Sequence, residues 1–247
     1  MSIKTITNYS PNFYPKIRSL NEIKFIIFHY TGMRKEFEAI NKLTDLKSEV
    51  SSHYLIKNNG QIIAIVPDLY VAWHAGSSSW KSFKSLNKNS IGIEISNMGH
   101  NFNYKKFSKK QIKSIIKLSK FLIKKYKINK KNILGHSDIA PRRKKDPGEK
   151  FPWKYLAKHH IGFWHSVPEK ILKTKRSKKI DTLDKAHFYK NLSKIGYLIK
   201  NSKNIKKNKF LNYVTKAFQR RFRQELINGK VDQECLLISK NLAKKLN

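Results

Sequence analysis

The chain has 247 residues, of which 53 are lysine or arginine and 16 are aspartate or glutamate, so its formal net charge is +37. This length accommodates one sizeable domain plus a small one, and the single cysteine, Cys235, excludes an intramolecular disulfide. No run approaches the ~18 apolar residues of a membrane span, and residues 1–12 lack the basic start and apolar centre of a signal peptide. We therefore expect a cytoplasmic protein as the chain stands, or a periplasmic or envelope-associated one if a leader was removed.

The strong positive charge favours polyanionic partners such as nucleic acid, anionic lipid or acidic wall polymers. The lysines are, however, distributed along the chain rather than confined to one helix face, and no nucleic-acid-binding module is recognisable. We therefore interpret the charge as a lysine bias of solvated surfaces that can still steer an anionic substrate. No specific nucleic-acid partner is expected, and the oligomeric state does not follow from the sequence.

The first candidate site residue is His29. An apolar run at residues 23–28 predicts a buried strand, and His29 follows it directly. A histidine at a strand end is held rigidly enough to bind a metal. A lone buried histidine more often has its ring satisfied by the backbone, so a metal site requires further candidate ligands.

Two further histidines lie in the next part of the chain. His53 begins an apolar strand that continues through Asn58-Asn59-Gly60 into a second strand at residues 61–66, the pattern of a hairpin with an Asn-Gly turn. His74 lies in a loop with Trp80 shortly after it, and such aromatics beside small residues make a wall against which sugar or peptide can lie. We predict substrate contact for His53, His74 and Trp80. A structural role is the alternative for the two histidines, above all for His53.

A candidate catalytic carboxylate, Glu94, lies in the strand predicted at residues 91–95. Ile93 and Ile95 share one face of this strand, and Glu94 points to the other. If that other face is a cleft, Glu94 can take a proton from water and return it to a leaving amine, a contribution of typically ~10²–10⁴-fold. The alternative is a strand carboxylate that faces solvent.

The segment 133–148 sets a histidine and an aspartate on one connection. Its apolar start delivers His136 to the end of a predicted strand, and prolines at positions 141 and 147 force turns, so that Asp146 can fold back toward His136. An imidazole and a carboxylate suit Zn²⁺, and a catalytic zinc keeps three protein ligands and an open fourth position. His29, at the end of another strand, is the best candidate for the third ligand.

A candidate catalytic lysine, Lys144, lies two residues before Asp146. In an extended or turning segment the two side chains therefore project to the same side. The Lys144 ammonium can then stabilise the oxyanion that forms when a nucleophile adds to a carbonyl. Its neighbours Arg142, Arg143 and Lys145 favour the alternative of a solvated basic loop.

The pattern of elements predicts two domains. Strands alternate with helices around residues 37–45 and after Ser108, where Gln111 completes a capping box, and this implies an α/β domain over residues 1–170 with a central mixed sheet flanked by helices. Residues 171–182 are predicted as a basic linker. Residues 183–247 are predicted as a small all-α domain, with helical segments at 183–197, 210–226 and 233–246.

The motifs along the first domain occur in the order of a known family. HYT after an apolar strand, SSHYLI, AWHAGSSSW, NSIGIEI and GHSDIAPRRKKDPG resemble the zinc-dependent N-acetylmuramoyl-L-alanine amidases of the type 2 amidase family, over about residues 5–160. The resemblance implies zinc ligation by His29, His136 and Asp146. It also implies that Glu94 is the catalytic carboxylate, that Lys144 is the catalytic lysine, and that the segment around His74 lies along the substrate cleft.

The last part of the chain carries a second, shorter resemblance. YKNLSKIGY, KAFQRRF and NGKVDQECLLISKNL resemble, in that order, the three-helix peptidoglycan-binding domain that is often appended to wall hydrolases. The chain departs from that pattern in a lysine-rich insertion at residues 200–209 and in Arg220, Arg221 and Arg223. The alternative is a helical bundle that only packs on the catalytic domain.

Together these patterns predict an enzyme that uses Zn²⁺ to hydrolyse the amide between N-acetylmuramic acid, or its anhydro form, and L-alanine of the stem peptide. Its expected partner is peptidoglycan or a soluble muropeptide, and the sequence does not decide between these two forms of substrate. The main alternative is a non-catalytic peptidoglycan recognition protein. A nucleic-acid-binding protein, indicated by charge alone, is a third hypothesis.

Overall fold

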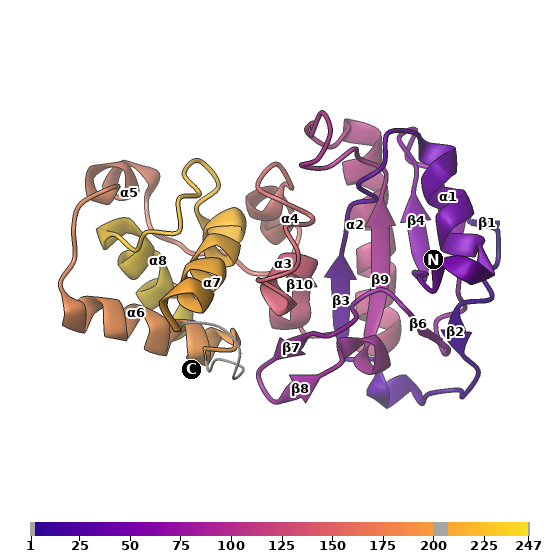
Figure 1. Ribbon diagram of the computed structural model, residues 1–247, viewed down its shortest axis with the longest axis horizontal. Coiled ribbons are helices and arrows are strands. Elements are labelled where there is room, and N and C mark those ends of the chain that lie inside the picture. Colours follow the sequence, from indigo (N-terminus) through magenta and orange to yellow (C-terminus); the bar gives the residue numbers. More distant parts are fainter. Residues whose placement is uncertain (1–2, 200–206, 247) are drawn as a thin grey trace.

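The structure is a computed structural model that describes residues 3–199 and 207–246. A part built on a β-sheet lies beside a part built from helices, and the chain passes from the first to the second without returning (Figure 1). None of the helices in the described ranges combines the length and the apolar character that a membrane span needs.

The central sheet has six strands in the order β1-β5-β4-β9-β3-β10. The pair β4 and β5 is antiparallel and all other neighbours are parallel, so the predicted mixed sheet is confirmed. The strands of this sheet are β1 (Ile6–Thr7), β3 (Phe25–Phe28), β4 (Tyr54–Ile56), β5 (Ile62–Ala64), β9 (Ser90–Ile95) and β10 (Ile133–Gly135). Two small antiparallel pairs lie outside it: β2 (Phe13–Tyr14) with β6 (Val71–Ala72), and β7 (Ser79–Trp80) with β8 (Phe83–Lys84).

The hairpin between β4 and β5 forms where Asn58-Asn59-Gly60 predicts it. The Gly60 N–H donates to the Lys57 carbonyl at 2.9 Å, and Ile56 pairs with Ile62. Gly60 has φ +84°, and a Cβ there would lie 2.8 Å from the Lys110 carbonyl oxygen. Only glycine fits this turn, because both the backbone conformation and the close approach of the next helix exclude a side chain.

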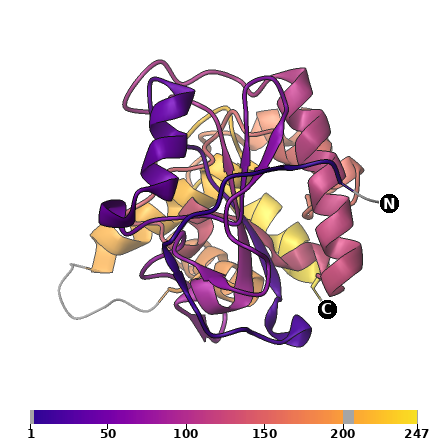
Figure 2. The same cartoon turned by 90° about the vertical axis from the view of Figure 1, so that its right-hand side faces the viewer.

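Helices cover both faces of the sheet, as Figure 2 shows for α1 (Glu36–Thr44) on one side and α2 (Lys109–Tyr126) on the other. Ile26 and Phe28 of β3 belong to the core under α2, whereas the alternating Phe25 and Ile27 belong to a separate core on the opposite face. The other helical elements of this part are α3 (His136–Ile139), α4 (Trp153–Lys158) and the 3₁₀ turns η1 (Leu20–Glu22), η2 (Leu46–Ser48), η3 (Leu86–Asn89) and η4 (Lys130–Asn132).

Helix α2 begins at the predicted capping box. The Ser108 hydroxyl accepts the Gln111 N–H at 3.1 Å, and the Gln111 side-chain oxygen accepts the Ser108 N–H at 2.9 Å. Two backbone donors that a helix N-terminus leaves free are thus satisfied locally, which is why this helix start is readable from the sequence.

In the described ranges, the last part of the chain contains four helices: α5 (Glu169–Lys175), α6 (Thr182–Ile195), α7 (Lys207–Phe222) and α8 (Gln233–Lys244). The last three correspond to the predicted helical segments. Residues 171–182, predicted as a linker, contain most of α5, which the sequence analysis does not predict. Its Leu172 is buried, and Arg176 just beyond it contacts the Glu234 carboxylate at 2.7 Å, so both anchor this segment to α8. Of the lysine-rich insertion at 200–209, residues 200–206 lie outside the described ranges.

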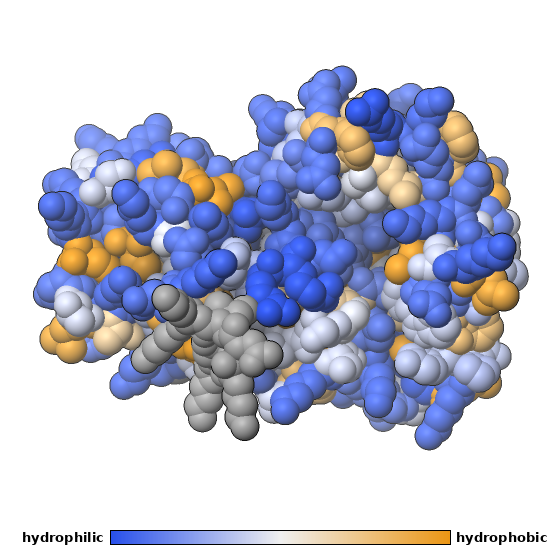
Figure 3. Space-filling model, in the orientation of Figure 1, coloured by the Kyte–Doolittle hydropathy of each residue, from blue (hydrophilic) through white to orange (hydrophobic). Residues whose placement is uncertain are grey.

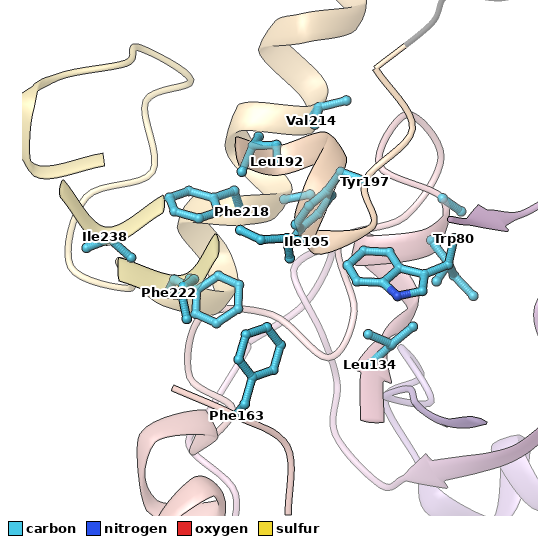
Figure 4. Close-up of a cluster of buried hydrophobic side chains, with 14 of the residues drawn as sticks. Trp80, Leu134, Phe163, Leu192, Ile195, Tyr197, Val214, Phe218, Phe222 and Ile238 are labelled. Carbon is cyan, nitrogen blue, oxygen red and sulfur yellow. The ribbon is translucent and has the colours of Figure 1, made fainter. Parts of the chain in front are cut away.

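A single hydrophobic core joins the two parts. Trp80 and Leu134 from the sheet-containing part lie next to Ile195 and Tyr197 from the end of α6, and Phe218 of α7 belongs to the same cluster (Figure 4). The Trp80 and Tyr197 rings meet edge to face with centroids 4.8 Å apart. The helical part is therefore packed onto the sheet-containing part rather than held by a free tether.

The outer surface is largely hydrophilic on the face in view. Hydrophilic residues cover most of the face seen in Figure 3, over both parts of the molecule, with smaller hydrophobic areas between them.

Candidate metal centre and active site

Sheet register brings His29 and His136 together. Strands β3 and β10 are parallel neighbours, and Phe28 pairs with Gly135, the last residue of each strand. The next residue in each chain segment is a histidine, so the two imidazoles leave the same edge of the sheet side by side. His136 is the first residue of α3, a single helical turn that the sequence analysis does not predict and that ends just before Pro141.

Asp146 returns to this edge through the loop that follows α3. The Ser137 N–H donates to the Asp146 carbonyl oxygen at 2.8 Å, and the Tyr104 hydroxyl donates to the Pro147 carbonyl oxygen at 2.6 Å. The main chain on both sides of the Asp146 side chain is therefore held. The fold thus brings the three predicted metal ligands to one point.

The three side chains converge through one atom each. His29 Nδ1 lies 2.9 Å from His136 Nδ1, and Asp146 Oδ2 lies 3.1 Å from both nitrogens. All three residues are buried, and they form the one cluster of metal-binding side chains found in the described ranges.

The surrounding hydrogen bonds assign the tautomers of both imidazoles. Ser90 Oγ donates to the Leu86 carbonyl at 2.6 Å and accepts from His74 Nε2 at 3.2 Å, which leaves His74 Nδ1 as an acceptor. His29 Nε2 donates to this atom at 3.0 Å, so the lone pair of His29 Nδ1 is free. His136 Nε2 donates to the Ala75 carbonyl at 3.1 Å and likewise leaves its Nδ1 lone pair free.

Three hydrogen-bond acceptors thus face one another at van der Waals distance or closer. Such an arrangement is repulsive unless a cation lies between them, and two neutral imidazoles with one carboxylate are a donor set that suits zinc. The second nitrogen of each imidazole is anchored, as is usual for metal-binding histidines.

The protonation states of these groups fit the same assignment. Burial lowers the pKa of His29 to about 4, so its ring is neutral near pH 7. Burial raises the pKa of the Asp146 carboxyl, but the neighbouring His136 and His29 side chains outweigh this effect and hold that pKa well below its usual range.

A cavity of about 460 Å³ opens beside the three residues. Two of the predicted catalytic residues line this cavity: Glu94, from β9, and Lys144, from the loop after α3. Among the described residues the buried Glu94 Oε2 has no hydrogen-bond partner, so this oxygen is available to a molecule in the cavity. Burial raises the pKa of Glu94 to about 8, and Asp146 adds to the rise whereas Lys144 opposes it.

Of the residues predicted to contact substrate, His74 alone lines this cavity. His53 is fully buried, where its Nδ1 accepts the Gly92 N–H at 3.0 Å, and it does not line the cavity. Trp80 is 0 % exposed because the end of α6 packs over it. The expected aromatic wall at Trp80 is thus absent from the cavity, and Trp73 lies there instead.

His74 also fixes the orientation of the His29 ring by accepting its Nε2 hydrogen, a contact that its position in the sequence does not reveal. The Asn87 side-chain oxygen accepts the N–H groups of His74 (3.1 Å) and Ala75 (2.6 Å) and fixes this loop. The His74 ring lies directly over Gly92, where a Cβ would be 2.4 Å from it. Asn87, Ser90 and Gly92 therefore belong to the site, although residue types of this kind carry no metal-site signal in a sequence.

The mixed α/β fold places two histidines and an aspartate at a sheet edge, next to a carboxylic acid and a lysine in one cavity. This arrangement is that of a hydrolase with a possible metal site. Residues 19–149 match the family model described as N-acetylmuramoyl-L-alanine amidase (Amidase_2). The chain belongs to this family.

Relatives of known structure cover both parts of the chain. The N-acetylmuramoyl-L-alanine amidase AmiD of Escherichia coli (strain K12) is 36% identical over 236 residues, 90% of this chain and 83% of that protein. Its structure in complex with the substrate anhydro-N-acetylmuramic acid-L-Ala-D-gamma-Glu-L-Lys matches with a TM-score of 0.78 and covers 91% of this chain and 90% of that one. AmpDH3 from Pseudomonas aeruginosa, in complex with anhydromuramic pentapeptide, matches with the same TM-score at 29% identity and covers 94% of each chain.

Proposed function

We propose that this chain is a zinc-dependent amidase that hydrolyses the bond between N-acetylmuramic acid, or its anhydro form, and L-alanine of the stem peptide. The observation that carries the proposal is the convergence of three acceptor atoms, His29 Nδ1, His136 Nδ1 and Asp146 Oδ2, beside the unpartnered carboxylate oxygen of Glu94. Family membership and the ligands in the structures of AmiD and AmpDH3 support the choice of substrate.

His29, His136 and Asp146 are the residues that would hold the metal. A zinc ion bound there supplies an acidified water and polarises the substrate carbonyl. The protein contributes by burying His29, which lowers the pKa of its ring, and by aiming the Nδ1 atoms of both histidines at one point through His74 and the Ala75 carbonyl.

Glu94 is the proposed general base and acid. It faces the cavity from the strand next to β3, and its Oε2 can accept the proton of the attacking water and then deliver it to the leaving amine. A carboxyl group whose pKa is raised to about 8 by burial is suited to both steps near neutral pH, because it can give up a proton as readily as it takes one.

Lys144 is the proposed stabiliser of the developing negative charge. It is half-buried in the cavity wall, whereas its neighbours Arg142 and Lys145 are exposed. Its ammonium therefore meets the substrate carbonyl oxygen in a partly desolvated environment, where a fixed charge acts more strongly than in water. With Lys42, Arg143 and Lys145 it also makes the cavity attractive to the carboxylates of a stem peptide.

A non-catalytic peptidoglycan recognition protein is the second candidate. Such a protein needs the cavity but neither the converging ligand set nor a buried acid without a partner. Because burying an unpaired carboxyl group is costly, the retention of Glu94 at the cavity wall favours catalysis over binding alone.

Metal removal separates the two candidates. The protein loaded with zinc is expected to release stem peptide from a soluble anhydro-N-acetylmuramyl peptide, to lose this activity in excess chelator, and to recover it when zinc but not magnesium is restored. Peptide release is measured by chromatography. Binding without release in the zinc-loaded protein would support the recognition protein instead, and rates on sacculi measured in parallel assign the preferred form of substrate.

The hydrogen bond from His29 to His74 gives a further prediction. His74→Ala removes the acceptor that assigns the His29 tautomer, and we expect zinc affinity to fall by ~10–100-fold, the range typical for outer-shell partners of metal ligands. The affinity is measured by competition with a chromophoric chelator. His187→Ala, at an exposed position in α6, is the control and should bind zinc normally. Equal affinities in both variants would leave His74 with a substrate-contact role alone.

We further propose that the catalytic residues all belong to a unit at residues 1–170, since the five proposed positions lie before residue 150. Residues 183–247 form a helical unit, which residues 171–182 join to the first. The packing of the second unit on the first supports a structural role for it, because Trp80 and Tyr197 share one core.

A further inference from the structure

Two side chains of the helical part contact Asp138, which lies next to the proposed metal ligands. This residue lies in α3, two positions after the proposed ligand His136, and its side chain is buried. Asp138 Oδ2 accepts the Gly135 N–H at 2.8 Å and the Arg221 Nη1 donor at 2.6 Å, and Asp138 Oδ1 accepts the Tyr197 hydroxyl at 2.6 Å. Arg221 belongs to α7 and Tyr197 follows α6, so two of the three donors come from the helical part.

Arg221 holds both ends of the segment that carries His136. Its Nη2 donates to the carbonyl of Ile133, the first residue of β10, while its Nη1 contacts Asp138. The guanidinium also lies 4.5 Å from the centre of the Trp153 ring, so α4 fixes it from the side. A planar fork with two directed donors is what allows one residue to bridge these two points.

This bridge controls the backbone of two proposed ligands. His136 lies between Ile133 and Asp138, and the next residue, Ser137, donates its N–H to the carbonyl of Asp146. A shift or rotation of α3 would therefore move the His136 ring and release the main chain of Asp146 together. Neither Arg221 nor Tyr197 lines the substrate cavity.

We propose that Arg221 and Tyr197 are positioning residues for the metal centre, acting through Asp138, so that the helical part completes the catalytic site. This inference rests on the proposed metal site. It assigns to the last helices a function in the chemistry of the enzyme that does not depend on whether they bind wall polymer.

Arg223 provides a matched control. It lies two residues after Arg221 and is equally buried, but its guanidinium contacts Asp232, Asn228 and, at 3.6 Å, Glu234, all in the helical part. Arg221→Met and Arg223→Met therefore each remove one buried arginine and leave one buried carboxylate without its main partner. Both substitutions are expected to lower the melting temperature. Of the two arginines, only Arg221 contacts α3, so only its loss should disturb the proposed metal site.

The test compares the two variants of the full-length protein in three measurements. Arg221→Met is expected to weaken zinc binding by ~10-fold or more and to lower kcat on a soluble muropeptide with little change in KM, because the metal centre and not the cavity is disturbed. Arg223→Met should keep the zinc affinity and kcat of the parent protein at temperatures where it is folded. Equal zinc affinities in the two variants, or equal losses, would overturn the proposal.

Tyr197→Phe is the milder variant, since it removes one hydrogen bond to Asp138 and keeps the ring packed on Trp80. If Arg221→Met does not fold, Tyr197→Phe decides the matter: weaker zinc binding than in Arg223→Met supports positioning, and unchanged binding contradicts it.

Amide hydrogen exchange of the metal-free protein separates this inference from the proposed function. Faster exchange at residues 135–140 in Arg221→Met but not in Arg223→Met supports the control of α3 by the helical part, whether or not the parent protein is an amidase. Unchanged exchange at these residues would overturn it. A parent protein without zinc binding or peptide release would contradict the proposed function alone.

Discussion

Replacing His136 with alanine is expected to abolish stoichiometric zinc binding and reduce peptide release to the background level. The substitution removes one of the three proposed ligands and leaves only His29 and Asp146 to hold the metal. Two protein ligands are too few for a catalytic zinc, which keeps three protein donors and one open position. Zinc content after dialysis, measured by atomic spectroscopy, and chromatographic detection of released peptide check the two parts of this prediction.

The control for His136→Ala is a variant that removes a histidine elsewhere, His187→Ala on the exposed face of α6. It should bind one zinc per chain and keep full activity. Full zinc occupancy in the His136→Ala protein would contradict the proposed ligand set, and so would a crystal structure with zinc bound at other residues.

Replacing Glu94 with glutamine should separate proton transfer from metal binding. The substitution keeps the size of the side chain and removes its basicity, so we expect kcat to fall by ~10²-fold or more while zinc is retained. Zinc content and steady-state kinetics on a soluble muropeptide measure the two effects. Activity near that of the parent protein would show that Glu94 has a structural role.

The pH dependence of the parent enzyme offers a second measurement on Glu94. Burial raises the pKa of Glu94 to about 8, and a cation bound at the three proposed ligands would lower it from that value. The base form of Glu94 is populated only above this pKa, so kcat should rise with pH on the acid side of the profile and level off at or below about pH 8. Glu94→Gln should lack this acid limb, whereas a variant of Lys144 should keep it.

The amino-acid sequence by itself determined the local elements and the identity of the candidate ligands. These patterns depend on neighbours within a few residues: an apolar run before His29, a second one before His136, and the alternation around Glu94. The fold forms a strand at each of these places. The Asn-Gly hairpin and the capping box at Ser108 are readable for the same reason, since the groups that satisfy the backbone lie next to one another in the chain.

The tertiary structure alone decided which side chains meet across long stretches of sequence. Trp80 resembled a cleft residue in its local motif, but it is covered by Tyr197, which lies more than 100 positions away in the chain. His74 contacts His29, and Arg221 contacts Asp138 over a sequence separation of 83 residues. These pairings depend on which faces of the folded elements come together. The local periodicity of a segment predicts that segment's own helix or strand, but it does not determine which distant segment packs against it.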